Sequence, residues 1–377
     1  MPAMKILLGG VPFGCDNIGD EAILESVVAM LRKSIKEPLS ITVATADPAT
    51  ASRLGVDVEP AFGFAGVPRL GFIQALKGHD AYIWCGATGL SDYPHVALDL
   101  LETALDERVP SFIWGVGMDD ELNPVFFKAA GRRRRVLAAF GLVGLYEHRL
   151  RSKLKRRISR LLPRCAGVWL RDRESAAVLA RMGFRGAGVA VDTAFALRPA
   201  ASDLKPQDAP RLGICISTQR QVSDMEGLKR MLKAVRDSGA DILGIPMNPK
   251  TDRQLLDSLG VECIEGTDPA DVMEAASRCS VVLSSRLHLL ILAANAGVPI
   301  LGIARGSKLA NWLANFDRTV EGSVYDCDWD KVTADVLGAL ASRGNWDEVR
   351  AKAYETLQDR FDEAKGDFIG RLLECVE

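Results

Sequence analysis

A segment in the second half of the chain places a guanidinium, an imidazole and two hydroxyls at the end of an apolar run. Residues 280–284 predict a buried strand, and Ser284 and Ser285 end it. Ser285 is expected to be the N-cap of the all-apolar helix that follows, with Arg286 and His288 in the first turn. Free helix N–H groups, the positive end of the helix dipole and a guanidinium all favour anions. The pattern predicts an anion-binding site with a proton donor.

Lys308 is expected at the same place. It follows the next predicted strand, residues 299–303, and a turn at Gly306, so it returns to the same edge of the sheet. His288 is one of four histidines and lies at the polar end of an otherwise apolar helix, which favours a chemical role. An imidazole, with an ordinary pKa of about 6.5, can deliver a proton near neutral pH.

A glycine-rich loop over residues 9–21 joins the first predicted strand to the first predicted helix. It has neither the G-x-G-x-x-G spacing of dinucleotide sites nor a P-loop lysine. Two carboxylates at a helix N-terminus would repel a phosphate, so the loop is expected to contact a hydroxyl-rich acceptor. The alternative is that Asp20 only caps the helix. The candidate acceptor-binding residues of this loop are Asp16, Asn17, Gly19 and Glu21, with Asp20 as a candidate base.

Two other predicted strands end on charged residues. Arg171 follows residues 167–170, at the sheet edge where ligands gather in open α/β folds. It either binds a ligand or pairs with Asp172, which is expected to cap the next helix. Asp192 ends the predicted strand at 188–192, where a cap or a linker contact is the favoured interpretation.

A regular alternation of short apolar strands and helical segments determines where these residues lie in the fold. Such alternation predicts parallel sheets covered by helices on both faces. A stretch rich in Pro, Ala and Asp, residues 198–210, interrupts the alternation and is read as a linker. The remaining predicted strands are 5–9, 40–44, 81–85 and 110–115 before it, and 211–216, 241–246 and 261–264 after it.

The chain length supports the same organisation, because 377 residues exceed one ordinary hydrophobic core. The predicted fold class is α/β, with two Rossmann-like lobes whose parallel sheets face a central cleft. The expected domains are an N-terminal acceptor lobe (1–198), a linker (199–210), a C-terminal donor-binding lobe (211–345), and a C-terminal helix (346–377) that could pack back on the first lobe.

Composition restricts the class of protein. The eight cysteines are scattered singly, with no C-x-x-C pair and no Cys/His cluster at zinc spacing, so they are expected to be free thiols in a reducing cytoplasm and no metal or resident cofactor is predicted. The chain shows no secretory leader and no long apolar span. We therefore expect a cytoplasmic protein.

Net charge is only −2, yet residues 131–164 contain many Lys and Arg residues and only Glu147 as an acidic one. One interpretation is an ordinary solvated helix face. The other is a strip that docks on an anionic membrane, which would place the protein at the inner face of the membrane. Nucleic acid is not expected, because no aromatic residues for base stacking interleave the basic ones.

The ordered motifs of this chain resemble those of the polysaccharide pyruvyl transferase family. The matching residues span nearly the whole chain. They are Asn17-Ile18-Gly19-Asp20-Glu21, Gly115-Val116-Gly117, Arg171-Asp172-x-x-Ser175, Asp192-Thr193-Ala194-Phe195, Ser285-Arg286-Leu287-His288, and Gly302-Ile303 running to Lys308.

The resemblance implies a fold like that of two-lobed GT-B type glycosyltransferases, phosphoenolpyruvate as donor co-substrate, and a sugar as acceptor. In the implied reaction, the enol carbon of the donor is protonated, a sugar hydroxyl attacks C2, phosphate leaves and a second hydroxyl closes a ketal. His288 is the expected acid. Arg171, Arg286 and Lys308, with Ser284 and Ser285, would hold the donor, and Asp20 or Asp16 would accept the sugar proton.

One loop departs from the family pattern. Where the family usually has a glycine triplet, this chain has Cys85-Gly86-Ala87-Thr88-Gly89 after the strand at 81–85. Thr88 is a candidate acceptor contact, and whether the altered loop changes or abolishes the usual activity is not predicted. Two alternatives remain open: a glycosyltransferase with a nucleotide-sugar donor, and a non-catalytic sugar- or phosphate-binding protein. The acceptor sugar, its linkage, whether it is lipid-linked, and the oligomeric state are not predicted.

Overall fold

The computed structural model describes residues 3–199, 209–217, 222–304 and 306–375. These residues form two compact units. Unit 1 comprises Met1–Phe13, Val28–Asp192 and Arg360–Glu377, and unit 2 comprises Gly14–Val27 and Thr193–Asp359.

This division differs from the predicted domains in two respects. The loop that follows the first strand groups with the second unit, although it was expected in the N-terminal lobe, and the last helix is divided between the units near residue 360. Most of the predicted linker, at 200–208, and residues 376–377 of the predicted C-terminal helix lie outside the described residues.

Unit 1 is built on one parallel sheet, with strand order β3-β2-β1-β4-β5-β6-β7. Its central strands are almost completely buried, as expected of a sheet covered on both faces. The strands are β1 (Met4–Phe13), β2 (Leu39–Thr45), β3 (Asp57–Pro60), β4 (Ala81–Cys85), β5 (Ser111–Val116), β6 (Gly167–Leu170) and β7 (Gly188–Val189).

Helices cover the sheet of unit 1. One of them, α4 (Pro94–Asp106), packs its apolar face on β1, β4 and β5. Helix α1 (Ile18–Ser34) is shared between the units at residue 27. The others are α2 (Thr50–Leu54), α3 (Phe72–Leu76), α5 (Pro124–Phe127), α6 (Gly131–Ala139), α7 (Val143–Leu161) and α8 (Arg173–Arg181), with short 3-10 turns η1 (Arg69–Gly71) and η2 (Leu162–Arg164).

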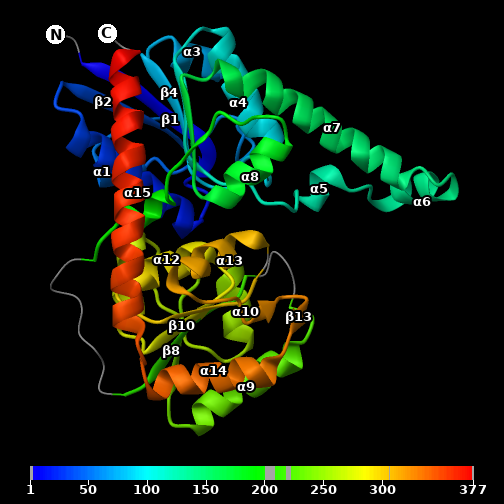
Figure 1. Ribbon diagram of the computed structural model, residues 1–377, viewed down its shortest axis with the longest axis vertical. Helices are drawn as coiled ribbons and strands as arrows, with labels where there is room; N and C mark the ends of the chain where they lie inside the picture. The colour runs from blue at the N-terminus through cyan, green and yellow to red at the C-terminus, as the bar shows by residue number, and fades with distance from the viewer. Residues whose placement is uncertain (1–2, 200–208, 218–221, 305, 376–377) are drawn as a thin grey trace. The chain divides into compact units, whose positions relative to one another are not determined.

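Unit 2 contains a second parallel sheet, with strand order β11-β10-β8-β9. Figure 1 shows this sheet between α12 and α13 on one face and α9 and α14 on the other. Its strands are β8 (Arg211–Cys215), β9 (Asp241–Gly244), β10 (Val281–Ser284) and β11 (Ile300–Gly302), and a separate small hairpin is formed by β12 (Gly322–Ser323) and β13 (Asp326–Cys327).

The helices of unit 2 are amphipathic where they cover the sheet, and α12 is buried along nearly its whole length. Together with the strands they enclose an aliphatic core. They are α9 (Met225–Asp237), α10 (Thr251–Ser258), α11 (Pro269–Ser277), α12 (Leu287–Asn295), α13 (Ser307–Leu313), α14 (Trp329–Ala341) and the first part of α15 (Trp346–Glu374), with 3-10 turns η3 (Thr193–Ala196) and η4 (Ala314–Phe316).

Most predicted strands agree with the observed ones, but the short strands β12 and β13 were not predicted, the predicted strand 188–192 is only Gly188–Val189, and two further differences concern residues 261–264 and β3. Residues 261–264 were expected to form a strand but make only an isolated bridge, from Cys263 to Gly244. Strand β3 was not predicted, because its residues Asp57–Pro60 lie at the sheet edge, are mostly exposed and lack an apolar run. None of the described helices combines the length and apolarity that crossing a bilayer requires.

Candidate active site

The four parallel strands of the unit 2 sheet end at one edge, and polar residues follow each of them. Parallel strands necessarily bring the segments after their carboxyl ends together, which is where ligands bind in open α/β sheets. Here the residues that follow β8, β9, β10 and β11 are, respectively, Ser217, Asp252, Arg286 and Lys308.

Arg286 forms a two-pronged ion pair with Asp252. Its Nε and Nη2 donate to Oδ2 and Oδ1 at 3.0 and 2.8 Å. Burial opposes the charged guanidinium, but the Asp252 carboxylate outweighs it and raises the pKa of Arg286. The backbone N–H of Asn248 also donates to Asp252, which is wholly buried. The pair fixes the orientation of the Arg286 side chain.

Sequence reasoning missed Asp252. The signal was present, because this carboxylate follows the predicted strand 241–246 and therefore returns to the sheet edge that carries Arg286. What the sequence does not show is which of the acidic residues after that strand turns inward.

Ser284, the last residue of β10, and Ser285, the residue after it, hold the loop rather than cap the helix. The Ser284 hydroxyl accepts the N–H of Arg286 at 2.8 Å, and the Ser285 hydroxyl accepts the N–H of Ser217 at 2.8 Å. The predicted Ser285 N-cap is wrong, because Arg286 itself occupies the N-cap position and α12 begins at Leu287. Both hydroxyls lie at the sheet edge but are engaged with the backbone.

His288 lies in the first turn of α12, against Gly19 of the N-terminal loop. A Cβ atom at Gly19 would lie 2.5 Å from Cγ of the His288 ring and closer still to Nδ1. Both residues belong to unit 2. Gly19 is therefore a packing requirement: only a residue without a side chain lets the first turn of α1 meet the imidazole.

Asp20 is buried next to this contact. Burial raises the pKa of its carboxyl to about 6, although the positive charges of His288 and Lys308 and a hydrogen bond from Asn17 partly offset the shift. Nδ2 of Asn17 donates to Oδ2 of Asp20 at 2.7 Å. Helix α1 begins at Ile18, so Asp20 lies in its first turn and does not cap it. A carboxyl that ionises near pH 6 is suited to proton transfer at neutral pH.

The other residues of this loop mainly hold its shape. The Asn17 side-chain oxygen accepts the N–H of Gly19 at 3.2 Å, and a Glu21 side-chain oxygen accepts the N–H of Gly14 at 2.8 Å. Asp16 forms an ion pair with Lys250, at 2.7 Å. Glu21 and Asp16 are thus partly committed to contacts within unit 2.

Lys308 is half-buried in the first turn of α13, after the extended N-cap residue Gly306. The positive charge of Lys308 acts to lower the pKa of Asp20, so the two groups interact electrostatically. The structure therefore brings together four of the predicted site residues in unit 2, namely Asp20, Arg286, His288 and Lys308.

Arg171 lies in unit 1, in a separate cluster of buried charges. Its Nε donates to Asp172 at 3.0 Å, and its Nη1 lies 3.8 Å from Asp192. Burial opposes its charge, but Asp172, Asp192 and Asp119 together raise the pKa of the guanidinium. A Cβ at Gly117 would lie 2.6 Å from its Cζ, which explains that glycine. Asp172 also caps α8 by accepting the N–H of Ser175.

Thr88, the predicted acceptor contact, is also in unit 1. Its hydroxyl donates to Asp92, four residues later in the same loop, and Thr88 is buried. Gly86 and Ala87 before it both have positive φ angles, of 80° and 59°. The loop that departs from the family's glycine pattern is thus tightly turned. The backbone N–H of Gly117 donates to the carbonyl oxygen of Ala87 at 2.7 Å and ties this loop to the segment after β5.

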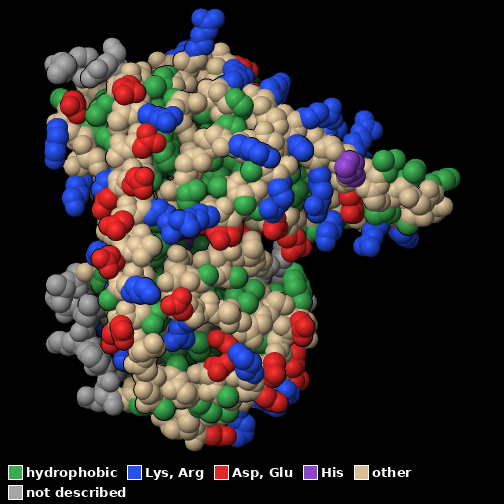
Figure 2. Space-filling model, viewed as in Figure 1, with side chains coloured by type: hydrophobic (Ala, Val, Ile, Leu, Met, Phe, Trp, Pro, Cys, Tyr) green, Lys and Arg blue, Asp and Glu red, His purple; other side chains and the backbone are tan. Residues whose placement is uncertain are grey.

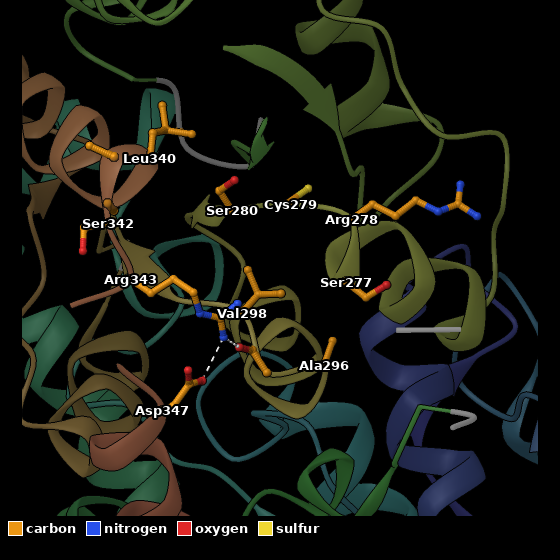
Figure 3. A pocket seen from close by; sticks show the side chains of 13 residues that line it. Ser277, Arg278, Cys279, Ser280, Ala296, Val298, Leu340, Ser342, Arg343 and Asp347 are labelled. Atoms are coloured by element: carbon orange, nitrogen blue, oxygen red, sulfur yellow. Dashed lines mark hydrogen bonds and ion pairs between the residues drawn. The ribbon is translucent and has the colours of Figure 1, made fainter. Parts of the chain in front are cut away.

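A cavity of about 350 Å³ in unit 2 lies at the opposite end of the sheet, before β10 and β11 (Figure 3). Its most prominent charged group, Arg343, is paired with Asp347 and with the carbonyl oxygen of Gly297, at 2.9 and 2.6 Å. This cavity lacks the convergent acid and cations of the carboxyl edge. Over the described ranges, no three His, Cys, Asp or Glu side chains are grouped so as to hold a metal ion.

Solved structures share this fold at low sequence identity. HepE of Anabaena, solved with UDP and glucose, is 13% identical with a TM-score of 0.60, covering 99% of this chain and 100% of that one. The UDP-GlcNAc 2-epimerase from Neisseria meningitidis, solved with UDP-GlcNAc, is 13% identical with a TM-score of 0.56, covering 98% and 100%. MnaA of S. aureus, solved with UDP, is 10% identical with a TM-score of 0.58, covering 94% and 92%.

These likenesses show an α/β fold with two parallel sheets, similar to GT-B glycosyltransferases, which confirms the predicted fold class. The likeness to UDP-GlcNAc 2-epimerases was not predicted. A search among curated proteins finds no match. The family model for polysaccharide pyruvyl transferases matches residues 17–307, which include the end of the N-terminal loop, from Asn17 on, and the first turn of α12. With more than half of its length matched, this chain belongs to the polysaccharide pyruvyl transferase family of pyruvate-transferring enzymes.

Proposed function

We propose that this protein transfers pyruvate from phosphoenolpyruvate to two hydroxyls of a sugar in a cell-envelope or exopolysaccharide glycan, forming a pyruvate ketal and releasing phosphate. The observation that carries the proposal is the grouping of an imidazole, a carboxyl of raised pKa and a lysine at the carboxyl edge of the unit 2 sheet. Family membership supports the reaction class.

Proton transfer is assigned to His288 and Asp20. The imidazolium of His288 protonates C3 of the donor, which makes C2 electrophilic. A sugar hydroxyl attacks C2 and gives its proton to the Asp20 carboxylate. Phosphate departs with the C2–O electron pair, and the second hydroxyl closes the ketal ring and releases its own proton. The pKa of Asp20, about 6, leaves the carboxyl mainly ionised and still basic at neutral pH.

Anion binding is assigned to Lys308, to Arg286 and to the start of α12. Asp252 occupies Nε and Nη2 of Arg286, so Nη1 is the nitrogen proposed to bind the donor. The first N–H groups of α12 and the positive end of its dipole add to the attraction for the phosphate and carboxylate. Arg171 and Thr88 contact carboxylates of unit 1, and the steps above depend on unit 2 alone.

The acceptor and the location are also proposals. Pyruvate ketals form across two hydroxyls of one sugar, so the acceptor must present a pair of neighbouring free hydroxyls. A lipid-linked precursor at the cytoplasmic face of the membrane would present such a sugar to a protein that acts inside the cell.

Ligand stabilisation tests the donor. Phosphoenolpyruvate at about 100 times its Kd should stabilise the folded protein by about 2.7 kcal/mol, which is measurable as a higher melting temperature. UDP-sugars such as the UDP-GlcNAc bound in two structures of similar fold should leave it unchanged. Stabilisation by a UDP-sugar alone would favour the glycosyltransferase alternative. Stabilisation by phosphoenolpyruvate without phosphate release from a mixed glycan pool would favour a binding protein.

A further inference from the structure

A helical arm in unit 1, defined here as residues 124–156, carries no part of the site described above. It comprises α5, α6 and the first turns of α7, and Figure 1 shows α6 at its far end, away from the sheet of unit 1. No residue of α6 is buried. The arm is fixed at its base, where Leu154 and Ile158 of α7 are buried.

The end of the arm exposes an unusual density of large apolar side chains. Phe140 is 73% exposed and Leu145 is 66% exposed, values that a water-soluble surface normally avoids for neighbouring residues of this size. Figure 2 shows hydrophobic side chains gathered at the end of this projection. We call this set the apolar tip; it consists of Val136, Phe140, Leu142 and Leu145.

Basic side chains flank the apolar tip. Between residues 131 and 156 there are nine Lys and Arg residues and one acidic residue, Glu147. Glu147 is engaged with the backbone N–H of Ala129, at 3.1 Å. Within the described part of the chain, Arg132, Arg134 and Arg135 form no ion pair.

The basic strip predicted from the sequence, residues 131–164, is therefore shorter than expected. Arg157, Arg160 and Arg164 pair with carboxylates of α4, so acidic residues outside 131–164 neutralise this end of the strip. The partners are Asp99, Glu102 and Asp106. Within residues 131–164, all of which the structure describes, the basic side chains that have no carboxylate partner belong to the arm.

We infer that the arm docks on an anionic lipid bilayer, with the apolar tip inserted among the acyl chains and the flanking arginines bound to headgroup phosphates. Four consecutive arginines, Arg132–Arg135, span a full helical turn, so some face the membrane in any orientation of α6. Their aliphatic stems can lie along the acyl region while the guanidinium groups stay at the headgroups. This inference concerns an interaction surface and does not depend on the reaction.

The positive charge of the arm and its exposed apolar residues together favour an anionic bilayer over a second copy of the chain or a nucleic acid. A second copy bound tip to tip would bring two arms of the same strong positive charge together, which is repulsive. A nucleic acid would neutralise the arginines but would leave Phe140 and Leu145 in water. An anionic bilayer satisfies both features, since basic residues and a buried apolar face are the two signals of interfacial binding.

Vesicle binding tests the inference. The full chain should bind vesicles of phosphatidylglycerol and phosphatidylcholine at low salt, and high salt should weaken but not abolish binding, because the apolar tip contributes a salt-independent part. Phe140→Ser with Leu145→Ser should weaken binding at least about tenfold. Arg132→Gln through Arg135→Gln should do the same. The charge-matched control replaces four exposed lysines elsewhere by Gln and should bind as wild type; these are Lys33, Lys77, Lys229 and Lys233.

Insertion can be read directly by fluorescence. All six tryptophans of the chain are buried, so Phe140→Trp adds one exposed reporter. Its emission should shift to the blue with anionic vesicles, and lipids brominated on the acyl chain should quench it. A reporter that stays accessible to aqueous quencher on the vesicles would overturn insertion. Absence of vesicle binding, or a concentration-dependent dimer abolished by the Ser variants, would overturn the docking surface itself. Phosphate release with a soluble acceptor should be unchanged in every arm variant.

Discussion

Gly19→Ala is the change whose effect follows most directly from the geometry of the site. Gly19 lies in the first turn of α1, and its backbone angles are not in the left-handed region. Alanine is therefore compatible with the backbone and would by itself favour the helix by about 1 kcal/mol. Any loss must come from the contact between the new methyl group and His288.

The size of that contact sets the magnitude. The methyl carbon would lie 2.5 Å from Cγ of His288, whereas carbon atoms in contact are about 3.5 Å apart or more. The imidazole or the start of α1 must therefore shift by about 1 Å. Overpacking of this kind costs about 1–3 kcal/mol, so the net change in stability is a loss of about 0–2 kcal/mol. A 1 Å displacement of a catalytic group can lower the rate about 100-fold.

The assay is phosphate release from phosphoenolpyruvate with a glycan acceptor, measured beside thermal unfolding. Gly338→Ala in α14 is the matched control, since no atom lies within 4 Å of its added methyl group, and it should be slightly stabilised with unchanged kcat. Gly19→Ala should instead show a large fall in kcat with little loss of folded protein. A kcat for Gly19→Ala within about threefold of wild type would refute the assignment of His288 as a precisely placed acid.

Four further changes probe the same site. His288→Gln should lower kcat by about 10²- to 10⁴-fold while sparing donor binding, as measured by isothermal titration; a variant retaining a tenth of wild-type kcat would exclude His288 as the acid. Lys308→Ala should raise the donor KM as well as lower kcat, and an unchanged KM would place the anion site elsewhere. Asp252→Asn should leave Arg286 as a buried unpaired charge and lower the free energy of unfolding by about 3–5 kcal/mol in denaturant titrations; a loss below about 1 kcal/mol would contradict the buried pair. Burial raises the pKa of Asp20 to about 6, so between about pH 4 and 6 the folded state keeps a proton that the unfolded state has released. The free energy of unfolding should therefore fall as pH rises from about 4 to 6. Asp20→Asn should remove that fall and the acidic limb of the kcat profile, and unchanged pH dependence in the variant would move the titration to another group.

Several parts of the fold could be predicted because they leave a periodic signal. The buried strands of both sheets are apolar runs bounded by Gly, Pro or Asp, and β4 and β6 occur at the predicted residues. Edge strand β3 has no such run and was missed. The division into units was harder, because the grouping of residues 14–27 with unit 2 depends on tertiary contacts such as the hydrogen bond from Ile18 to the carbonyl oxygen of Met247.

In the candidate site too, local sequence patterns predicted some residues, whereas features set by tertiary contacts could not be predicted. Arg286, His288 and Lys308 could be placed at one sheet edge because each follows a strand of the same parallel sheet. The partner of Arg286 could not be named, since Asp252 is one of several acidic residues near its strand. The proximity of Gly19 to His288 joins residues far apart in the sequence, and no local pattern encodes such a contact.

The central claim is that this chain forms a pyruvate ketal by protonating C3 of phosphoenolpyruvate. The most direct measurement is mass spectrometry of the glycan after reaction of the purified protein with phosphoenolpyruvate in D₂O. The account predicts a pyruvate substituent whose methyl group carries one solvent deuterium, formed in step with released phosphate and absent with His288→Gln. A glycan that gains no pyruvate, or that gains a sugar from a nucleotide-sugar donor instead, would contradict it.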